Sequence, residues 1–328
     1  MTNNEKYLVT TATGNTGFQV AQQLLKNGKR VKVMSRSRGP IIKTLHDMGA
    51  EITLGQLDNE IDMKKAVSGV QRVYYCHPII PGLLNNTTMF SEVAKQAKVE
   101  AVVNLGQYLA ELQFHPSRST NEHKNSYHVL NNANIGACHV TPGWFADNVF
   151  ATSLFITQLG RFPFPLGEGK CPVVSNEDIA AVSVAILQDP EGHGGKCYQP
   201  TGPKAISMED MLIIFSRVLG RKVKPMPMPT GMFFKATTQM GMHPYMISQL
   251  KYYLKDFQNN VFNYEPTDVV ERFTNRPAEN FEVISRRYFQ HAGLMNKNFS
   301  GLRQALKQFI QIGLSRAPTS HEMELWNY

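Results

Sequence analysis

The sequence predicts an α/β fold in which a doubly wound parallel sheet is followed by a smaller, mostly helical C-terminal lobe. Three observations support this prediction. Short apolar runs alternate with segments of helical periodicity over the first 150 residues, which is typical of parallel βαβ units. A glycine-containing turn, T-A-T-G-N-T-G, separates the first apolar run from the first helical segment. After about residue 150 the regular alternation ends.

The first βα unit is the clearest part of this pattern. Tyr7–Val9 predicts a strand, and the residues after the turn predict a helix that ends at Gly28, as helices often do at glycine. Its apolar residues recur at helical spacing, and they are Phe18, Val20, Ala21, Leu24 and Leu25.

The same alternation continues to residue 105. Strands are expected at 31–34, 51–54, 72–76 and 101–105, and helices at 41–48, 62–67 and 87–97. The largely apolar run 101–105 fits a strand buried on both faces of a sheet. Crossovers between such parallel strands are right-handed. We therefore expect residues 1–150 to form the first domain.

The second half of the chain is predicted to form a smaller lobe at 151–295 and a helical tail at 296–328. The segment near 170–200, with a helix at 179–187, is a candidate to return to the sheet. Ser207 and Asp210 form a capping box that predicts a helix through about residue 218. The prolines of 225–229 exclude a helix there.

Two further segments of the second half allow alternative interpretations. Residues 231–257 are rich in Met, Phe and Tyr, and they form either a lid over an apolar substrate or the core of the lobe. A tail helix at 302–312 carries an apolar stripe, and it is expected to dock on the body of the protein or on a partner. The stripe consists of Leu302, Leu306, Phe309 and Ile310.

Composition and cysteine spacing exclude several classes of protein. The chain of 328 residues is 42% hydrophobic and 18% charged, as soluble globular proteins are. It has no apolar run of about 18 residues and no signal-peptide pattern, so neither a membrane-spanning helix nor secretion is expected. The cysteines lack zinc-ligand spacing and predict reduced thiols in a cytoplasmic protein without a metal; they are Cys76, Cys138, Cys171 and Cys197.

The formal net charge of +8 raises the question of a polyanionic partner. The basic residues are spread along the chain, and no basic motif with interleaved aromatic residues is present. A solvated basic surface is therefore the better interpretation, and a nucleic-acid partner is not expected. A phosphorylated cofactor would account for a few of these charges.

The turn after the first strand indicates a dinucleotide site. Gly14 is placed for close approach of a pyrophosphate, and Gly17 for close packing of the helix on the strand. Thr11 stands where the first glycine of G-x-x-G-x-x-G is expected. It either holds a strained backbone or shifts the turn, and a decayed site is the alternative. Small polar groups that suit a phosphate remain at Thr13, Asn15 and Thr16.

The next two strand ends indicate which dinucleotide binds. The second strand ends in M-S-R-S-R, without the acid that contacts the ribose in NAD-binding proteins. Arg36 can instead form bidentate hydrogen bonds to a 2′-phosphate, which favours NADP (NADPH). The alternative is that Arg36 and Arg38 are ordinary loop cations. Gln56 and Leu57 follow the third strand, where a loop along the adenine edge is expected.

Six blocks of the chain, to about residue 290, resemble the NmrA-like family of atypical short-chain dehydrogenases. They are VTTATGNTG, VMSRS, ITLGQLDN, HVTPGWFADNV, YQPTGPKAISMEDMLIIFSRVLGR and TNRPAENFEVISRRYF. Thr11, Gln56 and Thr141 depart from the family pattern, which has Gly, Asp and Arg there. The resemblance implies an NADP-binding Rossmann domain and a smaller lobe, with substrate between them. It does not imply one reaction, because the family lacks a uniform catalytic set.

No tyrosine of the chain has a lysine four residues later, so the Tyr-x-x-x-Lys pair of ordinary short-chain dehydrogenases is missing. His123 aligns with a position where the family carries Lys or His. A histidine suits proton transfer near neutral pH, which makes His123 the candidate acid or base. The alternative is that His123 only contacts the nicotinamide or its ribose.

The ends of later strands supply the remaining candidates for cofactor contact. His77 and Pro78 follow the fourth strand, where ligands of open α/β sheets bind, although a plain loop is the alternative. Asn104 ends the fifth strand and could orient a water or the nicotinamide ribose. The resemblance places the segment of Pro142, Trp144 and Phe145 beside the nicotinamide ring. Core packing is the alternative for Trp144.

Together these features predict an NADP(H)-dependent oxidoreductase that passes a hydride to a flat, fairly apolar acceptor such as a quinone or enone. The expected partner is a small apolar or aromatic substrate, with no membrane, and a homodimer is left open. The alternative is a redox sensor that binds NADP without turnover and acts through a protein partner. A nucleic-acid-binding role would rest on charge alone.

Overall fold

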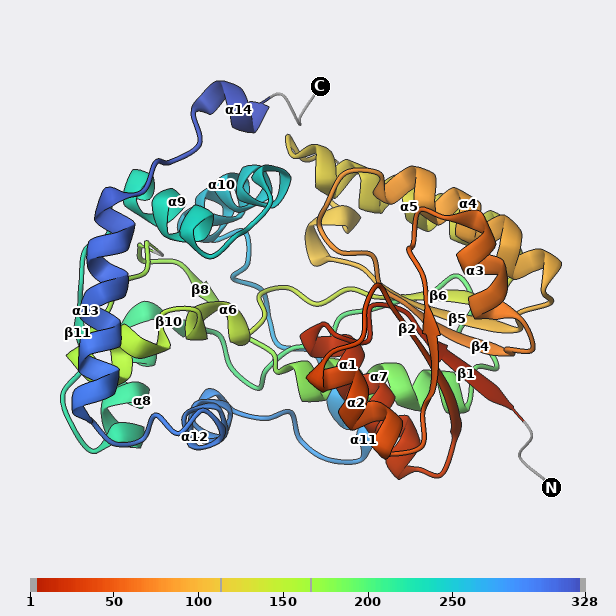
Figure 1. Ribbon diagram of the computed structural model, residues 1–328, viewed down its shortest axis with the longest axis horizontal. Helices are drawn as coiled ribbons and strands as arrows, with labels where there is room; N and C mark the ends of the chain where they lie inside the picture. Colours follow the sequence, from red (N-terminus) through yellow and green to blue (C-terminus); the bar gives the residue numbers. More distant parts are fainter. Residues whose placement is uncertain (1–4, 113, 166, 325–328) are drawn as a thin grey trace. The chain divides into compact units, whose positions relative to one another are not determined.

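The computed structural model describes residues 5–112, 114–165 and 167–324 (Figure 1). The chain divides into two compact units. The N-terminal unit comprises Met1–Pro142, Asn176–Pro200 and Asp268–Pro277, and the C-terminal unit comprises Gly143–Ser175, Thr201–Thr267 and Ala278–Tyr328. Residues 176–200 belong to the first unit, in agreement with the candidate return of the segment near 170–200 to the sheet. The ranges otherwise differ from the expected 1–150, 151–295 and 296–328, because residues 268–277 also belong to the first unit and the tail belongs to the second.

A seven-stranded parallel sheet with the order β3-β2-β1-β4-β5-β6-β9 forms the centre of the N-terminal unit. Its strands are β1 (Lys6–Val9), β2 (Arg30–Ser35), β3 (Glu51–Leu54), β4 (Arg72–Tyr75), β5 (Ala101–Leu105), β6 (Ala137–Val140) and β9 (Cys197–Tyr198). Tyr7 of β1 pairs with Val31 of β2 on one side and with Arg72 of β4 on the other. The chain therefore reverses its direction of travel across the sheet at β1, where open α/β sheets bind ligands.

Helices cover both faces of this sheet, as the doubly wound prediction requires. Figure 1 shows α3, α4 and α5 on one face and α1, α2, α7 and α11 on the other. Their bounds are α1 (Asn15–Lys26), α2 (Pro40–Asp47), α3 (Glu60–Val67), α4 (Leu83–Gln96), α5 (Arg118–Asn132), α7 (Asn176–Gln188) and α11 (Val269–Thr274), with a 3₁₀ turn η1 (Tyr108–Glu111). Strand residues such as Leu8 and Val102 are fully buried between these layers, which confirms a sheet covered on both faces.

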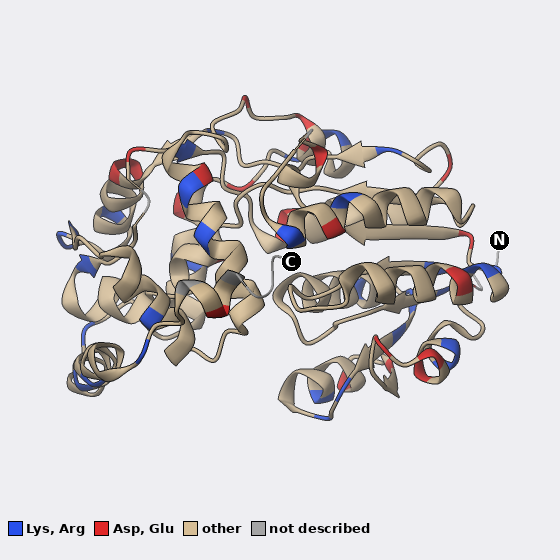
Figure 2. Ribbon diagram, turned by 90° about the horizontal axis from the view of Figure 1, so that it is seen from above, with Lys and Arg blue, Asp and Glu red and all other residues tan. Residues whose placement is uncertain are grey.

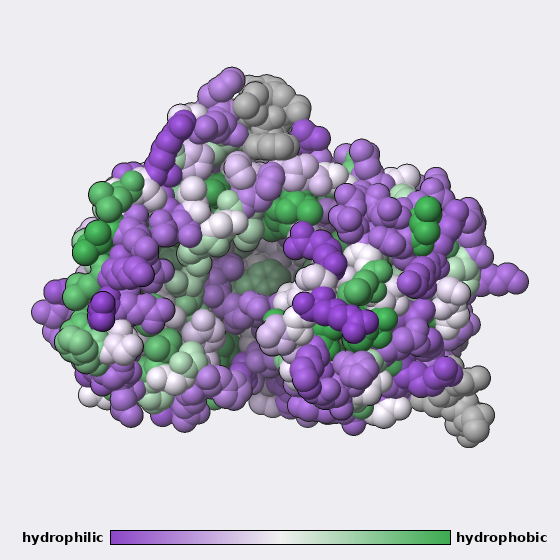
Figure 3. All heavy atoms as spheres, in the orientation of Figure 1, coloured by the Kyte–Doolittle hydropathy of each residue, from purple (hydrophilic) through white to green (hydrophobic). Residues whose placement is uncertain are grey.

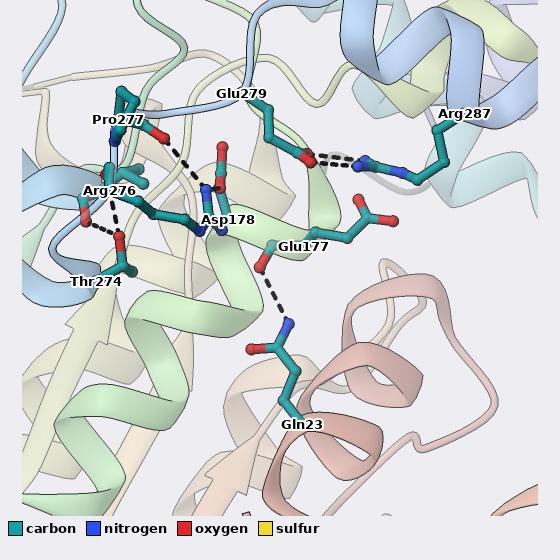
Figure 4. Close-up of polar contacts among 9 residues, drawn as sticks. Gln23, Glu177, Asp178, Thr274, Arg276, Pro277, Glu279 and Arg287 are labelled. Atoms are coloured by element: carbon teal, nitrogen blue, oxygen red, sulfur yellow. Dashed lines mark hydrogen bonds and ion pairs between the residues drawn. The ribbon is translucent and has the colours of Figure 1, made fainter. Parts of the chain in front are cut away.

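Polar contacts hold the two late segments in the N-terminal unit (Figure 4). The Gln23 side chain on α1 donates a hydrogen bond to the carbonyl of Glu177 at 3.2 Å. The carboxylate of Asp178 is fully buried, and it pairs with the guanidinium of Arg276 at 2.6 Å. A buried charge is tolerated only when it is paired, so this contact ties the segment after α11 to α7.

The C-terminal unit is mainly helical and has an aromatic core. It contains α6 (Asp147–Phe150), the π-helical turn η2 (Phe155–Leu159), α8 (Met208–Leu219), α9 (Thr230–Gln239), α10 (Pro244–Gln258), α12 (Phe281–His291), α13 (Phe299–Leu314) and α14 (Ser320–Glu324). Strand pairs form between β8 (Lys170–Cys171) and β10 (Ile206–Ser207), and between β7 (Arg161–Phe162) and β11 (Lys224–Pro225). The Phe150 ring contacts those of Phe215, Phe281 and Phe289.

The predicted capping box is confirmed at the start of α8. The Ser207 hydroxyl accepts from the Asp210 backbone N–H, and the Asp210 carboxylate accepts from the Ser207 backbone N–H. Gly220 ends the helix with a φ of 62°.

The tail helix α13 docks within the C-terminal unit through a face different from its apolar stripe. It buries Gly301, Ala305 and Ile312, whereas Leu306 and Ile310 of the stripe are exposed, and Figure 3 shows the resulting apolar surface. The reason is close approach: a Cβ on Gly301 would lie 2.8 Å from the Gln158 side chain.

Four general features bear on the expected class of protein. Lys and Arg are interspersed with Asp and Glu in Figure 2, and several form ion pairs such as Lys64 with Glu60 at 2.6 Å. All four cysteines are unpaired thiols. No helix within the described ranges has the length and apolar character needed to cross a bilayer. Among the same residues no cluster of three potential metal ligands occurs.

Candidate functional site

A cavity of about 490 Å³ lies at the carboxyl ends of β1, β2, β3 and β4, on both sides of the point where the strand order reverses. The sheet topology and the sequence motif therefore indicate the same place. Many of the residues expected to bind a cofactor line this cavity, namely Thr11, Thr13, Gly14, Thr16, Arg36, Gln56, Leu57, His77 and Pro78. Asn15 and Gly17 belong to the adjoining first turn of α1.

Thr11 occupies the left-handed region of backbone space, with a φ of 47°. This conformation is normally reserved for glycine, and a β-branched residue there carries strain of about 1–3 kcal/mol. The Thr11 hydroxyl donates a hydrogen bond to the Cys76 carbonyl at 2.9 Å, and the Thr11 carbonyl accepts from the Gly14 N–H at 2.9 Å. The substituted turn thus keeps the glycine conformation, and Thr11 holds a strained φ.

The two glycines that remain in the motif, Gly14 and Gly17, differ in how much space a side chain would have at each position. A Cβ on Gly17 would lie 2.5 Å from the Thr11 carbonyl oxygen, a distance that no packing adjustment of side chains can relieve. A Cβ on Gly14 would lie 3.3 Å from the same oxygen, which is tight but tolerable. Gly17 therefore allows α1 to pack against the turn, as the motif predicts.

The start of α1 is suited to an anion. Gly14 is its N-cap and supplies no side chain to accept from the first backbone N–H groups, and no acid occurs in the first turn. Helix N-termini of this kind attract phosphate through their N–H groups and the helix dipole. A dinucleotide pyrophosphate fits this end of the cavity.

The ends of β2 and β3 form the adenosine side of the cavity. Arg36 is exposed and lines the cavity directly after β2. The turn after β3 is ordered by a hydrogen bond of 3.0 Å from the Gln56 N–H to the Asp62 carboxylate. Gly55 is required there, since a Cβ would lie 2.7 Å from the Cβ of Asp62. A guanidinium at Arg36 matches a 2′-phosphate in charge and geometry.

His77 is fixed in one neutral form at the end of β4. Its Nδ1 lies 2.7 Å from the Pro78 carbonyl oxygen, which only accepts, so Nδ1 carries the hydrogen. Its Nε2 lies 3.0 Å from the amide nitrogen of Asn86 and accepts from it. Burial lowers the pKa of His77, which stabilises the same neutral ring.

His123 lies on α5 and is buried. Burial, with a smaller electrostatic contribution from the neighbouring His77, lowers the pKa of His123 to about 3. The ring is therefore neutral at pH 7. It holds no imidazolium proton for delivery to a substrate at that pH, which weighs against general acid catalysis by a charged His123.

Asn104 is part of a polar network inside the unit and does not line the cavity of about 490 Å³. Its amide nitrogen lies 3.1 Å from Nδ1 of His139, whose Nε2 lies 3.1 Å from the Asn131 side-chain oxygen. The Tyr127 ring stacks on His139 with ring centroids 4.2 Å apart. These contacts engage the Asn104 amide and leave its expected contact with ribose or water as a hypothesis.

The segment of Pro142, Trp144 and Phe145, which was expected beside the nicotinamide ring, is divided between the two units after Pro142. The Pro142 carbonyl accepts from the Tyr108 N–H at 3.1 Å within the N-terminal unit. In the C-terminal unit, Phe145 forms a β-bridge with Val174. Trp144 is 2% exposed, and its ring lies 5.2 and 5.7 Å from those of Phe257 and Phe262. Trp144 packs in this aromatic core and also lines a cavity of about 70 Å³ there.

Sequence reasoning missed Asn86, which orients His77, and the wall residues Met34, Cys76 and Ile80. Asn86 lies in the first turns of α4, and nothing in its local sequence identifies the histidine nine residues earlier as its partner. The only sequence signal for this role of Asn86 was that a polar residue lies near the start of the helix after β4.

Comparison with known proteins gives a consistent picture. The model of the NmrA-like family matches residues 3–284. An NAD(P)H azoreductase of Xenophilus azovorans is 26% identical over 299 residues, covering 85% of this chain and 96% of the relative. Quinone oxidoreductase 2 of Escherichia coli is 22% identical over 236 residues, covering 71% and 82%.

Two kinds of solved structure share the fold. The NADPH complex of an NADPH-dependent quinone oxidoreductase from Escherichia coli superposes with a TM-score of 0.74 and 18% identity, covering 87% of this chain and 99% of the other. NmrA, a negative transcriptional regulator, superposes with a TM-score of 0.73 and 16% identity, covering 88% and 97%.

Proposed function

Because the chain belongs to the NmrA-like family, we propose that it is an NADP(H)-dependent oxidoreductase that reduces a flat, fairly apolar acceptor such as a quinone or enone. The observation that carries this proposal is the cavity of about 490 Å³, where Gly14 and Arg36 lie on one surface at the point of strand reversal. The azoreductase and quinone oxidoreductase relatives support the acceptor class.

The residues of this cavity suit NADPH part by part. The start of α1 would hold the pyrophosphate, and Arg36 would pair with the 2′-phosphate. The turn at Gln56 and Leu57 would border the adenine, and His77 with Pro78 would line the path toward the nicotinamide. When bound, NADPH supplies a hydride.

Reduction of a quinone oxygen also requires a proton. The neutral ring of His123 does not supply one as an imidazolium at pH 7, since its pKa lies at about 3. We assign proton supply to water. His123 is buried and does not line the cavity of about 490 Å³, so we give it no direct contact with the acceptor. Catalysis then depends mainly on positioning of the two reactants.

Turnover is tested by mixing the protein with NADPH and a panel of quinones and enones, and following the absorbance of the reduced nicotinamide. We expect acceptor-dependent oxidation of NADPH. His123→Gln is expected to retain turnover with an unchanged pH profile between pH 5 and 8. Loss of a titration in that range on substitution would instead identify His123 as the proton donor.

The alternative is a redox sensor that binds NADP without turnover. The lack of a Tyr-x-x-x-Lys pair and the fold shared with the regulator NmrA support it. Tight binding of NADPH without oxidation by any acceptor of the panel would favour the sensor.

The 2′-phosphate assignment has its own test. Arg36→Ala is expected to weaken NADPH binding about 10- to 100-fold, the value of a charge-assisted hydrogen-bonded pair, and to change NADH binding little. Arg38→Ala is the matched control, because Arg38 is exposed in the same loop but does not line the cavity. Equal losses for the two cofactors in Arg36→Ala would contradict the assignment.

A further inference from the structure

The tail helix α13 carries more exposed large apolar side chains than any other element of the described chain. Phe299 and Leu314, at its two ends, are each 83% exposed, and Ile310 is 60% exposed. Single exposed apolar side chains are ordinary, but a contiguous group marks an interaction surface. Figure 3 shows this surface, and its members are Phe299, Leu302, Leu306, Phe309, Ile310 and Leu314.

The helix that carries this surface is fixed to its own unit at both ends. The side chain of Gln158, which is buried, donates to the Asn296 carbonyl at 3.2 Å and accepts from the Asn298 N–H at 3.1 Å. At the other end, the Lys235 ammonium donates to the Gly313 carbonyl at 3.3 Å. The opposite side of α13 packs within the unit, so the apolar side chains face outward. The family match ends at residue 284, before this helix begins.

The charge around the apolar surface has one sign. Residues 283–321 contain six Lys and Arg residues and no Asp or Glu. Lys297, Arg303 and Lys307 are exposed and form no ion pair with any residue that the structure describes. Arg303 lies one turn from both Phe299 and Leu306 on the helix, so its positive charge lies among the apolar side chains. The other three cations pair with acids from outside this range, and they are Arg286, Arg287 and Arg316.

This combination suits the surface of an anionic bilayer. Helices that lie in a bilayer interface insert apolar side chains below the head groups, while Lys and Arg remain at the lipid phosphates. A second copy of the chain fits less well, because a twofold pair brings the same cationic face of both copies together. A soluble polyanion would use the charges but leave the apolar side chains in water.

We propose that α13 is an interfacial helix that binds the C-terminal unit to an anionic membrane surface. Phe299, Ile310 and Leu314 insert below the head groups, and Arg303 and Lys307 contact the lipid phosphates. Such a helix lies on the bilayer and does not cross it. The proposal therefore replaces the expectation of no membrane partner without requiring a membrane-spanning helix, and it does not depend on the proposed function.

Co-sedimentation with lipid vesicles tests the proposal on the full chain. The probes are vesicles of phosphatidylcholine alone and vesicles in which about 30% of the lipid is phosphatidylserine. We expect at least tenfold stronger partition to the anionic vesicles, and weaker partition as salt screens the charges. Lack of sedimentation with the anionic vesicles, or equal partition to the two kinds of vesicle, would overturn the proposal.

Two exposed phenylalanines provide a matched pair for the apolar contribution. Phe299→Asn is expected to weaken partition to anionic vesicles at least tenfold. Phe114→Asn makes the same change in the N-terminal unit, at a position 77% exposed, and is expected to change nothing. Both positions are exposed, so folding should persist, and circular dichroism checks it. Equal partition of the two variants would exclude α13 as the membrane contact.

The cationic contribution has its own matched pair. Arg303→Gln combined with Lys307→Gln should weaken partition to anionic vesicles at least tenfold and leave partition to phosphatidylcholine unchanged. Lys26→Gln combined with Arg38→Gln removes the same two charges from exposed positions of the N-terminal unit and should partition like the parent. Equal losses in the two double variants would show that net charge, rather than α13, determines binding.

Two further outcomes would assign the surface to another occupant. A dimer seen by analytical ultracentrifugation that Phe299→Asn abolishes, without vesicle binding by the parent, would assign it to a second copy and overturn the membrane. Vesicle binding that requires Arg303 and Lys307 but is unchanged in Phe299→Asn would show attraction by charge alone and overturn insertion. None of these measurements uses NADPH, so failure of the proposed function would leave them unaffected.

Discussion

The two cavities of this protein are built in different ways. The cavity of about 490 Å³ in the N-terminal unit is lined by residues between Thr11 and Asn86, most of which lie at or just after the ends of strands of one sheet. The apolar cavity of the C-terminal unit is lined by residues between Trp144 and Ile312, drawn from elements far apart in the chain. The first is defined largely by backbone conformation at short turns, and the second by the packing of side chains.

This difference determines which substitutions can damage each cavity. A turn that approaches a helix closely is displaced when a single Cβ is added at one of its glycines, because the backbone atoms that it meets cannot move aside. Methionines form part of the wall of the apolar cavity, and they adapt to small changes by side-chain rotation. The cavity of the N-terminal unit should therefore respond strongly to small changes at its glycines, and the apolar cavity only to changes that fill it.

The largest effect is expected for Gly17→Ala. Its Cβ would lie 2.5 Å from a backbone oxygen, so α1 must move away from the turn at Thr11. We expect a loss of about 3 kcal/mol in NADPH binding, roughly 100-fold, from the upper end of overpacking costs. Isothermal titration calorimetry measures the affinity.

One control accompanies this variant. Gly39→Ala should bind NADPH normally, because no atom lies within 4 Å of its Cβ position. Equal losses of affinity in Gly17→Ala and Gly39→Ala would show that the packing of α1 against the turn does not determine cofactor binding.

A second prediction concerns the dependence of stability on pH in the N-terminal unit. The pKa of His123 is about 3 in the folded protein, whereas an exposed histidine titrates near 6.5. Between these values the unfolded chain binds a proton that the folded chain does not. Stability therefore falls as the pH falls from 6.5 toward 3, and His123 accounts for about 2 kcal/mol of this loss at pH 5.

His123→Gln should remove that part of the acid sensitivity. The difference in unfolding free energy between pH 7 and pH 5, measured by urea titration, should shrink by about 2 kcal/mol. His46→Gln serves as a control, because His46 is an exposed histidine on α2. An unchanged difference in His123→Gln would show that the ring accepts a proton in the folded state.

The sequence predicted the N-terminal unit better than the C-terminal unit, because turns at strand ends can be located from a sequence whereas side-chain packing cannot. Strand-end residues such as Gly14 and Arg36 could be assigned because the topology of a parallel sheet brings strand ends together. The contact between Asn86 and His77 could not, since it depends on side-chain directions. Hydrophobic periodicity predicted α13, yet its buried face is set by the small residues Gly301 and Ala305, which allow close approach.

The smallest effect is expected at Thr11, where the sequence left two geometries open and the structure shows a strained φ of 47°. Thr11→Val keeps the β-branch but loses the hydrogen bond to the Cys76 carbonyl, which still accepts from the Thr10 hydroxyl at 3.2 Å. Unfolding free energy should fall by about 1 kcal/mol in urea titrations. Thr11→Ser keeps the hydroxyl and should match the parent, and Thr13→Val controls for a methyl group at an exposed turn position. If Thr11→Ser lost as much stability as Thr11→Val, side-chain packing rather than the hydroxyl would hold this turn.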